Sequence, residues 1–109
     1  MSEANPAAEY AASIIVPTYN EEGNVAELIS RVSGALAGVN AELIIVDDSS
    51  DETPVIARAL APSAGIAVTV IHRDEAEGGL GGAVVTGIRA ARSGVCIVMD
   101  GDLQHPPEK

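Results

Sequence analysis

Two carboxylates, Asp100 and Asp102, follow an apolar run late in the chain and are separated by a single glycine. The small Gly101 allows both side chains to turn toward one point and a ligand to approach the backbone closely. Mg²⁺ and Mn²⁺ prefer such oxygen ligands, often together with substrate phosphates, and Gln104 adds a neutral oxygen nearby. The residues alone leave two interpretations open, a divalent metal site or an acidic turn that caps the next element.

A second acidic segment, Asp47–Ser50, also follows an apolar run. A carboxylate at such a position can accept hydrogen bonds from a base N–H or a ribose hydroxyl. The alternative is an Asx-type turn before a helix, which the residues alone favour. Tyr19, one of two aromatic residues in the chain, either stacks on a base or covers the edge of a sheet.

A glycine-rich segment at residues 78–82 (GGLGG) opens a helical pattern. Glycines before a helix are typical of phosphate binding at its N-terminus, but the spacing matches neither the dinucleotide fingerprint nor the P-loop. Close helix–sheet packing is an equal alternative. Arg73 either binds a phosphate or pairs with Asp74 and Glu75, and we interpret His72, at the end of the preceding apolar run, as structural.

Four short apolar runs precede these polar segments: Ser13–Val16, Leu43–Val46, Val68–Ile71 and Val95–Met99. None alternates apolar with polar residues, which is typical of strands buried on both faces of a parallel sheet. Open α/β sheets bind ligands at the carboxyl ends of their strands. We therefore expect the polar segments to lie together at one edge of the sheet.

Three amphipathic helical patterns lie between the apolar runs. The first, Val25–Leu36, repeats apolar residues with helical spacing after Asn24 as N-cap. The second begins at Thr53, the expected cap, and ends before Pro62, and the third spans Leu80–Arg92. The side chains expected to face the sheet are Val55, Ile56, Ala59 and Leu60 in the second, and Leu80, Val84, Val85 and Ile88 in the third. The order β-α-β-α-β-α-β predicts an α/β fold with right-handed crossovers.

Charge and composition exclude several classes of protein. Sixteen acidic residues against six basic ones give a net charge of −10, so a nucleic acid is not an expected partner. No stretch approaches the ~20 apolar residues of a membrane span, and Met1–Ala11 lacks the basic and apolar parts of a secretory signal. We expect a cytoplasmic protein without a transmembrane segment.

Four segments together resemble the family 2 glycosyltransferases, most closely the polyprenyl-phosphate (dolichyl-phosphate) mannosyltransferase branch. They are IIVPTYNEEGN at 14–24, LIIVDDSSDET at 43–53, GLGGAVVTGI at 79–88 and VMDGDLQHPPE at 98–108. The last is the most specific, because D-x-D-L-Q-H-P-P-E is characteristic of that branch. The resemblance covers residues 13–109, with residues 1–12 expected as a disordered or extended segment. It implies a parallel-sheet, nucleotide-sugar-binding domain of the GT-A-like, Rossmann-like kind.

The resemblance also implies roles for individual residues of the donor site. Pro17, Tyr19 and Glu21 would line the nucleoside pocket, and Val46 and Asp48 would contact the base.

The D-x-D segment would complete the donor site. Asp100, Gly101 and Asp102 would meet the diphosphate and the sugar, with Asp100 and Asp102 as the catalytic residues. Mg²⁺ or Mn²⁺ would be held by Asp100, Asp102 and Gln104. Gly101 stands where alanine is common in the family.

The implied reaction transfers a hexose, with mannose favoured, from a nucleotide sugar to a polyprenyl or dolichyl phosphate, with inversion at the anomeric carbon. GDP-mannose is the favoured donor and UDP-glucose the next. A phosphate monoester, with a second pKa of about 6, is anionic enough to attack without a general base. The family's domains continue well beyond D-x-D, so we expect this chain to carry the donor- and metal-binding half and to be inactive alone. The full-length protein would lie at the cytoplasmic face of a membrane.

Three alternatives stay open at the level of the sequence. The chain could bind a nucleotide without catalysing transfer, or belong to a UDP-glucose-dependent transferase of the same family. A metal-dependent phosphoryl or nucleotidyl transferase is the third. Its haloacid-type fold places D-x-D after the first strand, whereas here the motif follows the fourth.

Overall fold

Strands and helices alternate in the computed structural model, which describes residues 9–99. The elements are β1 (Ala12–Thr18), α1 (Val25–Ala35), β2 (Ala41–Asp47), α2 (Thr53–Leu60), a 3-10 turn η1 (Ala61–Ser63), β3 (Ala67–His72), α3 (Gly79–Ala90) and β4 (Cys96–Val98). The strands form one parallel sheet in the order β3-β2-β1-β4. The predicted α/β class and order of elements are confirmed.

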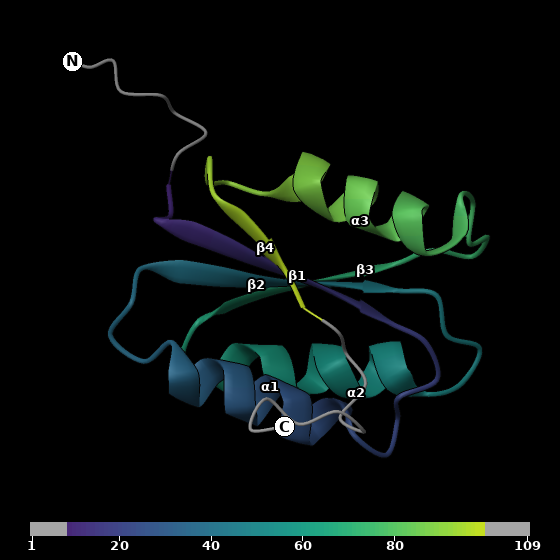
Figure 1. The fold of residues 1–109 in the computed structure, drawn as a ribbon. Coiled ribbons are helices and arrows are strands. Elements are labelled where there is room, and N and C mark those ends of the chain that lie inside the picture. Colours follow the sequence, from purple (N-terminus) through teal and green to yellow (C-terminus); the bar gives the residue numbers. More distant parts are fainter. Residues whose placement is uncertain (1–8, 100–109) are drawn as a thin grey trace, which may run out of the picture.

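The sheet is covered on both faces. Helices α1 and α2 lie against one face and α3 against the other (Figure 1). The apolar side chains of β1 and β2 alternate between the two layers. One core cluster, on the α1–α2 face, comprises Ile14, Val16, Val25, Leu28, Ile29, Val32, Leu43, Ile45 and Ala57. The other, on the α3 face, comprises Ile15, Ile44, Val46 and Ala83.

The prediction that all four strands are buried on both faces is correct for the two central strands and wrong for the outer two. Every residue of β2 is buried, and β1 is nearly so. In contrast, β3 and β4 are half-buried or exposed along their length. The reason is the strand order, because β3 and β4 lie at the two edges of the described sheet.

The predicted inward face of α2 is confirmed for Ile56 and Leu60, which pack against the core, and is wrong for the other two residues. Val55 and Ala59 were expected to face the sheet but are exposed, and Ala57 is buried in their place. The helix begins with Thr53 and Pro54, which are both buried. Because Thr53 is the first helical residue and its side chain turns inward, the inward stripe continues one turn later at Ala57.

Helix α3 also presents a different face from the predicted one, and it ends at Ala90 instead of Arg92. Leu80 is 71% exposed, and Val85 and Ile88 are exposed as well. The buried residues are Ala83 and Gly87. A Cβ on Gly87 would lie 2.5 Å from Ile15 Cγ2, so the helix lies too close to the sheet for larger side chains at these positions.

The residues before β1 are bonded to the segments that precede its two neighbouring strands, β2 and β4. The backbone N–H groups of Glu9 and Tyr10 donate to the carbonyl of Arg92, and that of Ala11 donates to the carbonyl of Asn40.

No helix within residues 9–99 has the length and hydropathy needed to cross a membrane.

Candidate functional site

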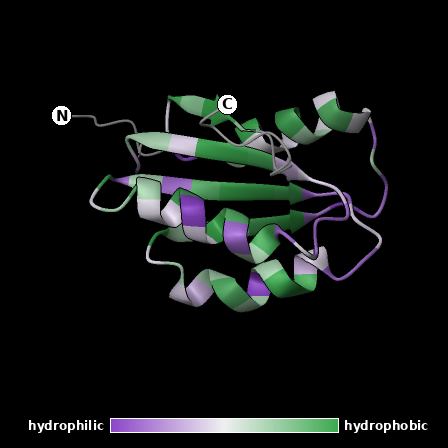
Figure 2. Cartoon of the chain, turned by 60° about the horizontal axis from the view of Figure 1, so that its bottom comes forward, coloured by the Kyte–Doolittle hydropathy of each residue, from purple (hydrophilic) through white to green (hydrophobic). Residues whose placement is uncertain are grey.

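The carboxyl ends of β1, β2 and β3 carry a row of polar residues in register. Thr18 lies beside Asp47, and Asp47 lies beside His72. Figure 2 shows hydrophilic loops gathered at this edge, beyond the arrowheads of the strands. For the loops that the structure describes, the predicted gathering at one edge is confirmed.

Asp47 is fully buried and acts as a common acceptor for its neighbours. Thr18 Oγ1 donates at 2.6 Å, Ser49 donates from its hydroxyl at 2.6 Å and its N–H at 3.1 Å, and His72 Nδ1 lies at 2.9 Å. A carboxylate only accepts hydrogen bonds, so His72 Nδ1 carries the proton. The ends of three strands are thereby tied together, and His72 is structural, as predicted.

The loops after β1 and β2 are bonded to each other. Asn20, at a positive φ of 52°, receives the Ser50 N–H on its side chain at 3.0 Å and donates its own N–H to Ser49 Oγ at 2.7 Å. Asparagine tolerates this left-handed conformation better than most residues. The Glu21 N–H likewise donates to Thr53 Oγ1 at 2.9 Å. These bonds fix the loop that carries the predicted nucleoside-binding residues.

Asp51 stabilises the start of α2. Burial raises the pKa of its carboxyl, but hydrogen bonds from the hydroxyl and N–H of Thr53 and from the Glu22 N–H outweigh burial and hold that pKa below its ordinary value. The Asx-type turn predicted for Asp47–Ser50 is present, since the Ser49 N–H donates to the Asp47 carboxylate, and Asp51 makes a second such contact with the Thr53 N–H. The prediction that Thr53 caps the helix is wrong, because Thr53 is the first residue of α2 and Glu52 holds the N-cap position.

Asp48 forms a two-point ion pair with Arg73, and each side chain is 12% exposed. Arg73 Nε donates to one carboxylate oxygen and Nη2 to the other, both at 2.7 Å. The Asp48 hydrogen bonds raise the pKa of Arg73 above its ordinary value, against the effect of burial. The sequence allows Arg73 to pair with Asp74 and Glu75, but in the structure it pairs with Asp48. Sequence spacing gave no signal for this pair, because its members lie 25 residues apart.

A pocket of about 330 Å³ lies at the same edge. Four of the five predicted nucleoside-contacting residues line it, namely Pro17, Tyr19, Glu21 and Asp48, together with Thr18, Ala76, Gly79 and Leu80. The Tyr19 side chain is 66% exposed, so its ring is accessible to a ligand. The β1 and β2 ends thus form one wall of the pocket, and the glycine-rich segment forms the other.

Val46, the fifth predicted contact, lies elsewhere. Its side chain is fully buried in the core under α3 and does not line this pocket. Its assigned role as a base contact stays a prediction.

A neighbouring hollow of about 310 Å³ extends the pocket toward β4. It shares Pro17 and Leu80 with the first pocket and adds Val84, Val98 and Met99. The Met99 N–H donates to the carbonyl of Ile15 at 2.9 Å, which fixes the end of β4 at this hollow.

The predicted metal-binding and catalytic residues follow Met99 directly in the sequence. Asp100, Gly101, Asp102 and Gln104 lie outside the described residues, so their roles stay predictions. Within residues 9–99, no group of three or more His, Cys, Asp or Glu side chains is placed to hold a metal ion.

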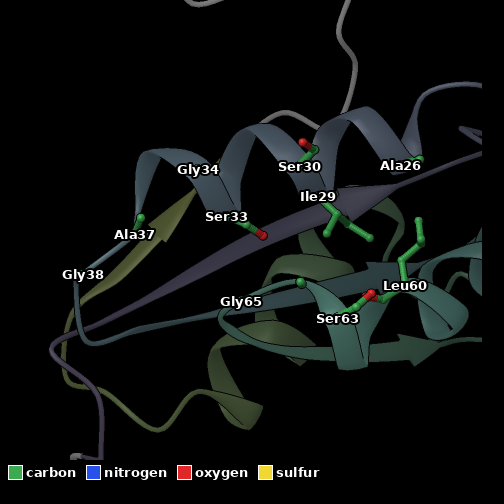
Figure 3. A pocket seen from close by; sticks show the side chains of 11 residues that line it. Ala26, Ile29, Ser30, Ser33, Gly34, Ala37, Gly38, Leu60, Ser63 and Gly65 are labelled. Carbon is green, nitrogen blue, oxygen red and sulfur yellow. The ribbon is translucent and has the colours of Figure 1, made fainter.

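A further hollow, of about 510 Å³, lies on the α1–α2 face. Ile29 and Ser33 of α1 point into it from one side and Leu60 from the other (Figure 3). Small residues near the ends of α1 and η1, such as Gly38 and Gly65, complete its lining. These segments lead into the amino ends of β2 and β3, so this hollow is remote from the carboxyl edge.

Known proteins share both the sequence and the fold. A family model described as Glycosyl transferase family 2 matches residues 13–109. A dolichol-phosphate mannosyltransferase of Pyrococcus furiosus is 50% identical over 97 residues, which cover 88% of this chain and 27% of that protein. A dolichol-phosphate mannosyltransferase of Mycosarcoma maydis is 44% identical over 102 residues, covering 88% of this chain and 34% of that protein.

A solved structure agrees with these matches. The mannosyltransferase PcManGT from Pyrobaculum calidifontis, in complex with GDP-Man and Mn²⁺, has a TM-score of 0.72 and 27% identity, covering 90% of this chain and 29% of that one. The chain thus spans between 27% and 34% of the length of these relatives. The family model covers all of the chain after residue 12, and the likeness to PcManGT confirms the predicted GT-A-like fold. The chain therefore belongs to glycosyl transferase family 2.

Proposed function

We propose that this chain forms the donor-binding part of an enzyme that transfers mannose from GDP-mannose to a polyprenyl or dolichyl phosphate. The observation that carries the proposal is the pocket at the carboxyl edge, where Pro17, Tyr19, Glu21 and Asp48 come together. The names of the two relatives support the sugar and the lipid-phosphate acceptor. The GDP-Man in PcManGT supports the donor.

The pocket residues suit a nucleoside. The accessible ring of Tyr19 offers a flat apolar face for a base or ribose. Asp48 uses one acceptor site on each carboxylate oxygen for Arg73. Because a carboxylate has about four such sites, Asp48 retains capacity to accept a base N–H.

The proposed metal site fits a hard divalent cation. Asp100, Asp102 and Gln104 offer only oxygen ligands, the set that Mg²⁺ and Mn²⁺ prefer, and Mn²⁺ is present in PcManGT. A bound cation would offset the charge that develops on the departing nucleoside diphosphate. These three residues follow Met99, whose side chain lines the hollow beside the donor pocket.

In the proposed reaction, an oxygen of the acceptor phosphate attacks the anomeric carbon of the sugar. The bond from that carbon to the diphosphate breaks, and the nucleoside diphosphate leaves with the electron pair. A phosphate monoester needs no proton removed before it attacks, because its second pKa is about 6. Because the acceptor is a lipid, we place the reaction at a membrane surface, and we propose the cytoplasmic face as its side.

Calorimetric titration tests the donor assignment. With Mn²⁺ present, we expect GDP-mannose and GDP to bind the wild-type chain more tightly than UDP-glucose. Asp102→Ala should weaken GDP-mannose binding by more than about tenfold, or 1.4 kcal/mol. Glu27→Ala is the control, because that carboxylate is 54% exposed on α1, pairs with Arg31 of the same helix and does not line the pocket. Unchanged binding by the Asp102→Ala variant would contradict the metal-site assignment. Tighter binding of UDP-glucose than of GDP-mannose would show that UDP-glucose is the donor.

A further inference from the structure

Arg73 makes four hydrogen bonds that join two separate segments of the chain. Its guanidinium reaches both oxygens of Asp48 at the end of β2, each at 2.7 Å. On its other side, Nη1 donates to the carbonyl of Glu77 at 2.9 Å, and Nη2 donates to that of Gly79 at 3.0 Å. A single side chain therefore bridges Asp48 and the segment that leads into α3.

This bridge lies behind the donor pocket. Arg73 does not line the pocket that contains Tyr19 and Asp48. It lines a different hollow, of about 460 Å³, together with residues of α3 such as Arg89. Ala76 and Gly79, on the segment that Arg73 holds, do line the donor pocket. Arg73 thus supports one wall of the pocket from outside.

Besides Arg73, the segment formed by residues 74–79, here called the glycine loop, is held near its two ends: Asp74 Oδ1 lies 3.5 Å from His72 Nε2, and the Gly78 carbonyl accepts from the Gly82 N–H at 3.0 Å. All of its side chains are exposed, so burial does not fix its conformation. Gly78 and Gly79 have positive φ angles of 78° and 58°, which glycine adopts at no steric cost. Two short backbone hydrogen bonds, from Glu77 N–H to Glu75 and from Gly79 N–H to Ala76, both 2.8 Å long, shape it locally.

The contact between the glycine loop and α3 is very close. A Cβ on Gly82 would lie 1.9 Å from the carbonyl oxygen of Glu77 and 3.0 Å from Arg73 Nη1. The absence of a side chain at Gly82 therefore lets the Glu77 carbonyl reach the position where Arg73 binds it. Part of the glycine-rich pattern is explained by this approach.

We propose that Arg73 is a positioning residue that couples the order of the glycine loop to the nucleoside pocket. It holds the Asp48 carboxylate in one orientation toward the base and holds the loop as the opposite wall. The ligand in this proposal, a nucleoside diphosphate, rests on the proposed function; the bridge between Asp48 and the loop does not. A substitution at Asp48 should therefore change the order of the glycine loop, and a change in the loop should change the orientation of Asp48, although the two belong to different elements.

Hydrogen exchange, measured by NMR on the chain without nucleotide, tests the bridge. Arg73→Gln should speed exchange of the Glu77, Gly79 and Gly82 amides by about tenfold relative to amides of β1 and β2. Asp48→Asn should also speed exchange of these loop amides, because an amide cannot accept from both arms of the guanidinium. The substituted residue does not itself belong to the loop. Arg73→Lys, which keeps the charge and loses the fork, should be intermediate. Arg89→Gln, in the same hollow, is the matched control.

Calorimetry with two ligands separates positioning from a general loss of structure. In the presence of Mn²⁺, Arg73→Gln should weaken the binding of GDP by about tenfold. The binding of inorganic pyrophosphate should not change, because pyrophosphate has no base to contact the pocket. The proposal is overturned if Arg73→Gln weakens the binding of both ligands equally. It is also overturned if the loop amides exchange no faster in Arg73→Gln than in Arg89→Gln. A wild-type chain that binds no nucleoside diphosphate contradicts the proposed function instead, and loop exchange alone then decides the role of Arg73.

Discussion

Asp47 and Asp48 are adjacent in the sequence but serve different purposes in the structure. Successive residues at the end of a strand point in opposite directions. Asp47 is therefore buried among Thr18, Ser49 and His72, whereas Asp48 lines the donor pocket. The first carboxylate holds the edge of the sheet together, and the second is available to a ligand.

At this scale, we predict that Asp47→Ala strongly destabilises the fold. The substitution leaves the Thr18 hydroxyl, His72 Nδ1 and the Ser49 donors without their acceptor. Buried donors without partners cost about 1–3 kcal/mol each, and partial relaxation should leave a net loss of about 3 kcal/mol in the free energy of unfolding. Urea denaturation measures it. The exposed Glu27→Ala, which removes only a surface ion pair with Arg31, is the control, with a change below about 0.5 kcal/mol; similar losses for both variants would contradict the role given to Asp47.

Among the elements, α3 is the one whose packing depends most on small residues. Its buried positions are Ala83 and Gly87, and its large apolar residues Leu80, Val85 and Ile88 face outward. A helix with this arrangement lies close to the sheet, where a larger side chain would overlap the strands. Close packing places the amino end of α3, with Gly79 and Leu80, at the donor pocket.

Two glycine-to-alanine substitutions test this packing. At Gly87, a Cβ would overlap Ile15 and press on Val46, so Gly87→Ala should cost about 1–3 kcal/mol of unfolding free energy. At Gly34, in the exposed part of α1, a Cβ meets nothing within 4 Å. Gly34→Ala should instead stabilise the chain by about 0.5–1 kcal/mol, through the higher helix propensity of alanine.

Thermal or urea unfolding of both variants measures the difference. Because the two substitutions are chemically identical and both lie in helices, propensity acts in the same direction in each. We expect the change in unfolding free energy to be a loss for Gly87→Ala and a gain for Gly34→Ala. A stabilising effect at Gly87 would contradict the close approach of α3 to the sheet.

The molecule as a whole exposes apolar surface along β4, an edge strand of the described sheet. Val95, Ile97 and Val98 are about half exposed, in and beside this strand. β4 pairs with β1 on one side. An exposed apolar edge strand offers a template for pairing with another chain.

We therefore predict concentration-dependent self-association of the 109-residue chain through β4. Ile97→Lys should raise the apparent dissociation constant by at least about tenfold, because a charge at an edge strand opposes strand pairing. Val55→Lys is the matched control, since Val55 is similarly exposed but lies on α2. Sedimentation velocity over a range of concentrations measures the effect, and equal responses of the two variants would rule out β4 as the contact.

The sequence by itself determined the alternation of four strands with three helices and the gathering of polar segments at one edge. It could do so because β-branched runs, helical periodicity and turn residues are local signals, and because the carboxyl ends of parallel strands share an edge. The resemblance to the family supplied most of the candidate donor pocket, since Pro17, Tyr19, Glu21 and Asp48 line it in the structure. The family also followed from motifs that stand in order along the chain.

Only the tertiary structure decided which strands are central and which face of each helix is buried. Strand order depends on contacts between distant residues, so β3 and β4 were wrongly expected to be as buried as β1 and β2. The face of α3 depends on how closely the helix approaches Ile15. Likewise, the bridge from Asp48 through Arg73 to Gly79 joins segments that no local pattern relates. Each of these features follows from packing between residues that are distant in the sequence, whereas sequence periodicity reports only on neighbouring residues.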